Sequence, residues 1–359
     1  MKKTIIAAAI AAGMAAPMAA NADVTVYSQL YSGINQAGGD AAGVTQNDND
    51  GRGRIGFKTS EELGGGMTAF AKFEIQVDVN DTVAAGGCND DFTVTQGAGT
   101  ADQQVTKIVD SSSSFCQRDS FVGVKAGWGA VSMGRMHGAY KTAGGVKFDP
   151  FVATALQARG NGGMAKGAYA SNGFISQLVQ YKSPKIAGVQ LQYQTSVLDN
   201  DNDATKESSE GDSLMAITYT GVKGLKVIYA SAKQAGTTTG GTEDKANTKF
   251  GAQYSIGKTM KVTFQSESVE AASNGAGDLT YVNFSYKMGK HNFVIANGSF
   301  AGDNAAHDMG YMALGDIIKL NKTTHLIIGQ RTTDGTGKAT TPNADKNVTS
   351  LTVGLRKNF

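Results

Sequence analysis

Proline and cysteine are both scarce in this chain, which has 4 prolines and 2 cysteines in 359 residues. Two cysteines exclude a fold held together by several disulfides. The 4 histidines are scattered singly and offer no ligand cluster for a metal. The 47 glycines, together with frequent Tyr, Thr, Asn and Gln, favour many strands joined by tight turns rather than helices.

Long apolar runs are absent beyond the first residues. Lys2 and Lys3 precede an Ala/Ile-rich stretch at 5–20 and an A-x-A site that ends at Ala22, which predicts a signal peptide at residues 1–22. A transmembrane helix anchor is the alternative, but the stretch is short for one. No later run approaches the ~18 apolar residues that a spanning helix needs, so a membrane-embedded mature chain would have to be a barrel.

The chain also has no marked excess of positive or negative charge. The chain has 33 Lys and Arg against 31 Asp and Glu, and removal of Lys2 and Lys3 leaves a balanced mature chain. This balance argues against nucleic acid as a partner. No Ser/His/Asp or Cys/His set stands at a meaningful spacing, so we expect neither catalysis nor a cofactor.

Strict alternation of apolar and polar residues is what the chain has instead. At 347–359, Leu351, Val353, Leu355 and Phe359 alternate with polar residues and glycine. A soluble sandwich strand can look the same, but strands of about ten residues with one apolar face also build transmembrane barrels. From residue 23 to residue 359 the pattern repeats, and its connections alternate between short and long. We therefore predict one all-β domain at residues 23–359, an antiparallel barrel of sixteen strands with short periplasmic turns and long extracellular loops.

Three segments carry a resemblance to a known family. DVTVYSQLYSGI follows the signal, and GRIGFKTSEELGGGMTAFAKFE and FVGVKAGWGAVSMGR come next, before a terminal Phe359. In this order they resemble the trimeric general porins of Gram-negative bacteria, of the neisserial and β/γ-proteobacterial type. The resemblance implies an outer-membrane channel for passive diffusion of small hydrophilic solutes and ions. It also implies a homotrimer in contact with lipid and lipopolysaccharide, and a terminal Phe359 that the barrel-insertion machinery reads.

The resemblance further implies a third extracellular loop, at 137–173, that folds into the lumen and narrows it. Strict alternation would place Arg135 on the lipid face, so we expect a bulge at Gly134 that turns it inward. Rings of charged side chains set the ions that a pore prefers. The candidates for the pore lining and constriction are Arg54, Lys58, Lys72, Glu74, Arg118, Lys125, Arg135, Lys147, Asp149 and Arg159.

The charge of these candidates predicts a weak anion preference. The third loop carries four bases against the single acid Asp149, and the facing wall offers further bases. The alternative is an acidic face formed by Glu74, Asp78 and Asp149 opposite the bases, with little net preference. Two other classes of function stay open: an outer-membrane enzyme such as a phospholipase, and an adhesin-like barrel with a plugged lumen.

Two polar segments suggest further features. Cys88 and Cys116 lie in one Ser/Thr/Gly-rich segment of an exported chain, which predicts a loop disulfide worth roughly 3 to 4 kcal/mol; two free thiols are the alternative. A weak calcium candidate has acids at positions 1, 3, 5 and 12 of a calcium-loop spacing, with Ala204 where the turn wants glycine, so a solvated acidic loop competes with it. Its four acids are Asp199, Asp201, Asp203 and Glu210.

Overall fold

The computed structural model describes residues 23–39, 43–47, 53–77, 79, 116–167, 169–171, 173–197, 211–235, 244–271, 275–335 and 348–359. Its strands are β1 (Asp23–Gly39), β2 (Gly43–Asn47), β3 (Arg54–Gly64), β4 (Met67–Gln76), β5 (Cys116–Ala126), β6 (Gly129–Met136), β7 (Ile175–Lys182), β8 (Val189–Ser196), β9 (Ser213–Tyr219), β10 (Leu225–Gln234), β11 (Lys245–Ile256), β12 (Met260–Val269), β13 (Gly277–Met288), β14 (His291–Gly302), β15 (Met309–Lys319), β16 (Thr324–Gly335) and β17 (Val348–Asn358). Three short helical segments accompany them: α2 (Ala139–Ala143), η2 (Gly145–Lys147) and η3 (Ala305–His307). Among the described residues, no helix is both long enough and apolar enough to cross a membrane.

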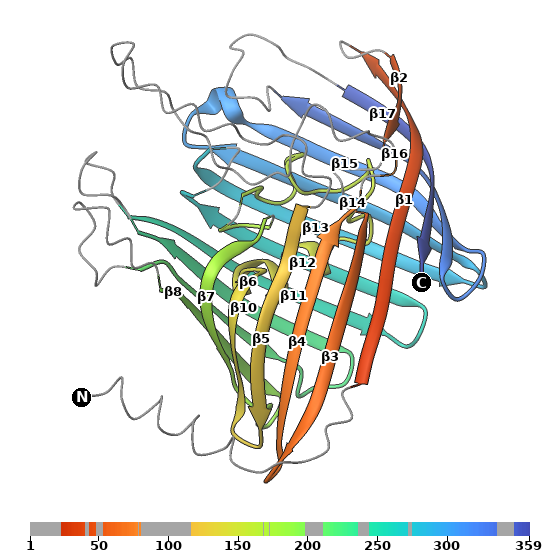
Figure 1. The fold of residues 1–359 in the computed structure, drawn as a ribbon. Coiled ribbons are helices and arrows are strands. Elements are labelled where there is room, and N and C mark those ends of the chain that lie inside the picture. Colours follow the sequence, from red (N-terminus) through yellow and green to blue (C-terminus); the bar gives the residue numbers. More distant parts are fainter. Residues whose placement is uncertain are drawn as a thin grey trace, which may run out of the picture.

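The strands form one closed antiparallel ring. Each strand pairs with its sequence neighbours, and β1 closes the ring by pairing with β17 from Gln29–Asn358 to Gly39–Val348. In Figure 1, β1 (red) lies beside β17 (blue). The segments β2 and β3 pair in succession with the two halves of β1, so they form a single barrel strand. The predicted barrel of sixteen strands is confirmed.

The two faces of the wall differ as the alternation predicted. Phe264 and Val262 on β12 are 43% and 39% exposed, whereas Thr263 and Gln265 between them are 0% and 1% exposed. An apolar outer face matches lipid, and an inner face rich in Gln, Asn, Ser and Thr matches water or polar chain. Short turns, such as those at 65–66, 127–128 and 289–290, join the strands at one end of the barrel, which we call the short-turn end.

Candidate functional site

The third loop, residues 137–173, lies inside the ring of strands, where Figure 1 shows it in yellow-green. It contains α2 and η2, and its apolar side chains Tyr140, Phe148, Phe151 and Leu156 are at most 1% exposed. These side chains pack against the inner wall and do not point into the lumen. The loop therefore adds a layer to one side of the barrel interior and narrows it.

Hydrogen bonds from the inner wall fix this loop along its length. Near its start, Gln194 of β8 accepts from the Ala139 amide at 2.6 Å, and the Tyr140 hydroxyl donates to Glu267 of β12 at 2.9 Å. The later contacts all hold loop carbonyls. They are Asn283 Nδ2 to Phe148 O (2.8 Å), Tyr311 Oη to Leu156 O (2.6 Å), Arg331 Nη1 to Ala155 O (2.7 Å) and Arg356 Nη2 to Val152 O (2.7 Å).

Glycines in the wall make room for this close approach. A Cβ at Gly329 would lie 2.6 Å from a methyl group of Leu156, and one at Gly315 would lie 3.1 Å from the Phe151 ring. A side chain at either position would push the loop toward the lumen. The small wall residues therefore contribute to the position of the loop as directly as the hydrogen bonds do.

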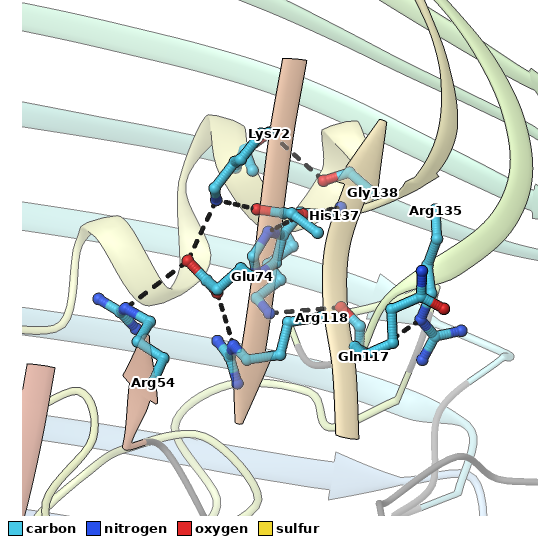
Figure 2. A network of polar contacts seen from close by, with 12 residues as sticks. Arg54, Lys72, Glu74, Gln117, Arg118, Arg135, His137 and Gly138 are labelled. Atoms are coloured by element: carbon cyan, nitrogen blue, oxygen red, sulfur yellow. Dashed lines mark hydrogen bonds and ion pairs between the residues drawn. The ribbon is translucent and has the colours of Figure 1, made fainter. Parts of the chain in front are cut away.

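Opposite charges meet on the wall formed by β3, β4 and β5, in a group that we call the Glu74 cluster. It consists of Arg54, Lys72, Glu74, Arg118 and Asp119, and Figure 2 labels the first four. Glu74 accepts from Arg118 Nε at 2.6 Å and lies 3.2 Å from Lys72 Nζ and 3.9 Å from Arg54 Nε. Lys72 also pairs with Asp119. Three bases and two acids thus leave one net positive charge on this part of the lumen wall.

A β-bulge assembles the cluster. The ladder between β4 and β5 shifts between Phe73 and Ile75, so that β5 has one extra residue there. Arg118 and Asp119 consequently both face inward, 8% and 4% exposed, although they are neighbours in sequence. Strict alternation would have placed one of them in lipid, and the sequence reasoning accordingly missed Asp119.

The entry to the third loop extends the cluster. Asp119 accepts from the His137 backbone amide at 3.1 Å, and its carboxylate lies 2.8 Å from His137 Nδ1. Burial lowers the pKa of His137 to about 3, so the neutral ring donates to the carboxylate at ordinary pH. The same ring lies 4.1 Å from that of Phe174, which three cations surround. They are Arg118 (4.7 Å), Lys141 (4.9 Å) and Arg135 (5.7 Å).

A shift in the strand ladder lies near Arg135, but its extra residue is in β7 and not at Gly134 of β6, where the sequence predicted the bulge; β6 keeps its pairing with β5 through Arg135. The ladder between β6 and β7 shifts between Gly134 and Met136, and Gln177 of β7 has a positive φ of 55°. The Arg135 guanidinium donates to Gln117 O at 3.2 Å and to Ser176 Oγ at 2.8 Å, beside the Phe174 ring. Figure 2 shows Arg135 next to Gln117 and apart from Glu74.

Two candidates of the third loop are buried inside the loop itself. The Asp149 carboxylate, 3% exposed, accepts from the amides of Phe151 and Ala158, both at 2.9 Å. Burial raises its pKa to about 6. Arg159 is 2% exposed and donates to Ser171 O at 3.1 Å. These two charges organise the loop instead of facing the lumen, whereas Lys147 is exposed.

Lys58 and Lys125 lie nearer the short-turn end. Lys58 Nζ is 4.6 Å from the centre of the Tyr27 ring, whose hydroxyl donates to Glu74 at 2.6 Å. Lys125 pairs with Thr68, seven residues along β5 from Arg118, which is about 23 Å at the rise of a strand. Lys58 therefore borders the Glu74 cluster, and Lys125 does not reach it.

Three other sequence predictions concern residues outside the part described. Cys88, the acids at 199–210 and the signal at 1–22 fall there, and the side chain of Cys116 does too. Within the described residues no group of three His, Cys, Asp or Glu could hold a metal ion. The terminal Phe359 is described: its side chain is 68% exposed, and its amide donates to Ser28 O at 3.0 Å.

Comparison with known proteins agrees with this architecture. A family model described as Gram-negative porin matches residues 7–352. Major outer membrane protein P.IB of Neisseria meningitidis serogroup B is 29% identical over 216 residues, which are 58% of this chain and 53% of that protein. The match thus spans about half the length of this curated relative.

Solved structures share the fold at low sequence identity. An anion-selective porin from Comamonas acidovorans is 18% identical with a TM-score of 0.69, over 94% of this chain and 100% of that one. Salmonella typhi OmpF, in complex with daunomycin, is 14% identical with a TM-score of 0.67, over 94% of this chain and 97% of that one. Together with the match of the family model along nearly the whole sequence, the closed barrel and its inward loop show that the chain belongs to the Gram-negative porin family of the outer membrane.

Proposed function

We propose that the chain forms a water-filled channel through which small hydrophilic solutes and ions diffuse passively, with a weak preference for anions. The observation that carries the proposal is the third loop, which is fixed to the inner wall by hydrogen bonds from strands β8 to β17. A loop held in this way narrows the lumen permanently and leaves the Glu74 cluster on the other wall. The short-turn end would face the periplasm.

The charge at the narrowing supports the anion preference. The Glu74 cluster has one net positive charge, and Arg135 lies on the adjacent Phe174 ring. Asp149 does not form an acidic face opposite these bases, because its carboxylate is held by amides of its own loop. This weakens the alternative of an acidic face formed by Glu74, Asp78 and Asp149, which would leave little net preference. A solved structure with the same fold is named as an anion-selective porin.

Planar bilayers test both parts of the proposal. Purified protein should give ohmic single-channel currents, and a salt gradient should give an anion-selective reversal potential. Absence of conductance would refute the channel and favour an enzyme or a plugged barrel. A cation-selective reversal potential, or one that does not move when Arg54 and Arg135 are both replaced by Ser, would refute the assignment of these arginines to the constriction.

The homotrimer is a further part of the proposal and rests on the family. Native mass spectrometry or crosslinking of the detergent-purified barrel should give a species of three chains. A sample that contains monomer alone would refute it.

A further inference from the structure

Lysines gather at the short-turn end of the barrel in a regular spacing. Five successive turns, from the one between β7 and β8 to the one between β15 and β16, each carry Lys-x-x-Lys. The pairs are 182/185, 223/226, 258/261, 287/290 and 319/322. The stretches 178–192, 216–228, 253–263, 285–294 and 317–327 hold these ten lysines and no Asp or Glu.

One lysine of each pair stands on a strand, on the face that lines the lumen. Lys261 follows the inward alternation of Thr263 and Gln265 on β12, and Lys287 that of Asn283 and Ser285 on β13. The same alternation applies to the other three strands, and the ladders run without a shift through all five positions. We call Lys182, Lys226, Lys261, Lys287 and Lys319 the wall lysines. Their partners Lys185, Lys223, Lys258, Lys290 and Lys322, the turn lysines, lie in the turns or at their edge.

Two pairs of wall lysines influence each other electrostatically. Lys226 feels the charges of Lys182 and of Lys147, the exposed base of the third loop, and Lys261 feels that of Lys287. Among the described residues, none of the five wall lysines forms an ion pair. Like charges placed together without acids cost free energy, unless a counter-ion neutralises them.

We propose that the wall lysines and Lys147 form a binding site for multivalent phosphate anions in the vestibule between the third loop and the short-turn end. The flexible ammonium groups of lysine bind phosphate as point charges, and they do not require the planar bidentate geometry of an arginine guanidinium. Several lysines around a low-dielectric cavity attract a multiply charged anion far more strongly than chloride, because each charge of the ligand feels the summed field. The proposal rests on the proposed channel and adds a site that is separate from the Glu74 cluster.

The paired spacing provides a matched control within the same three hairpins. The wall variant combines Lys226→Gln, Lys261→Gln and Lys287→Gln, and the turn variant combines Lys223→Gln, Lys258→Gln and Lys290→Gln. Both variants lose three positive charges at the same end of the barrel. They differ only in whether the charges stood on the lumen wall or in the turns.

The assay is block of the single-channel current by inorganic tripolyphosphate, added to both compartments in 0.1 M KCl. Wild-type current should fall with added tripolyphosphate. The half-blocking concentration should rise roughly tenfold in the wall variant and less than twofold in the turn variant, because only the wall charges line the path. In 1 M KCl, where the Debye length falls to about 3 Å, the wild-type block should weaken strongly.

The outcomes separate the two proposals. A wild-type protein that does not conduct would refute the channel itself. A conducting wild type that tripolyphosphate does not block, or wall and turn variants with the same half-blocking concentration, would refute the vestibule site alone. If the wall variant fails to insert, the single exchanges Lys287→Gln and Lys290→Gln decide by the same comparison, since both side chains are exposed.

Discussion

Replacement of Glu74 by Gln tests how the cluster sets ion preference. The exchange keeps the shape of the side chain and an oxygen that can accept a hydrogen bond from Arg118 Nε. In the wild type this nitrogen lies 2.6 Å from the Glu74 carboxylate. Asp119 still pairs with Lys72. The variant should therefore fold, and the net charge of the cluster should rise by one unit.

The size of the effect follows from Coulomb's law. A unit charge about 6 Å from a passing ion is worth ~0.7 kcal/mol in water, which screening at 0.1 M salt roughly halves. The potential acts in opposite directions on chloride and potassium, so their permeability ratio should shift about threefold toward chloride. Reversal potentials in a tenfold KCl gradient measure this ratio directly.

Asp316→Asn is the matched control. This exchange also removes one negative charge. Asp316, however, stands on the lipid-facing side of β15, where its Oδ2 lies 2.6 Å from His291 Nδ1. Its reversal potential should equal that of the wild type. A Glu74→Gln channel with an unchanged reversal potential, or one shifted toward potassium, would show that the cluster does not set the ion preference.

Three further predictions concern assembly, pairing of the cysteines and pH. Deletion of Phe359 should lower the amount of heat-modifiable barrel in the outer membrane without a change in synthesis; an equal amount of folded protein would contradict the role of this residue. Thiol labelling of the denatured, unreduced protein should find neither Cys88 nor Cys116 free, and two labelled thiols would exclude the disulfide. Because burial raises the pKa of Asp149 from 3.8 to about 6, the folded state binds the proton more tightly. Stability should therefore decrease by about 2 kcal/mol as pH rises from 4 to 6, and Asp149→Asn should remove this part of the decrease in unfolding titrations, whereas an identical pH profile would contradict it.

The barrel was predictable from sequence because its wall obeys one simple rule. Residues of alternate parity face lipid and lumen, so the strands, their number and the candidates Arg54, Lys72 and Glu74 followed from counting. The rule fails where a bulge adds a residue. The joint inward position of Arg118 and Asp119 depends on such a shift, which no local propensity marks.

The third loop was predictable as a segment but not in its contacts. Most of its partners lie on strands more than a hundred residues away, as with Tyr140 and Glu267, and no periodicity links the two. Burial of Asp149 is a similar case, because its partners are two amides of its own loop and the hydroxyl of Tyr281 on β13, whose positions depend on the whole packed segment. The Lys-x-x-Lys spacing, in contrast, is visible in the sequence, and it gains meaning only when the strand ladders show which lysine of each pair faces inward.

The attachment of the third loop also has a mechanical consequence for the barrel. A ring of strands resists stretching along its hydrogen bonds, but it can flatten into an ellipse by small rotations between neighbouring strands. The loop begins at β6, beside Asp119 of β5, and is tied to β8, β12 and β17 through Gln194, Glu267 and Arg356. The loop thus connects separate strands across the interior of the barrel. It would therefore resist flattening of the barrel under lateral pressure from the membrane, together with the wall itself.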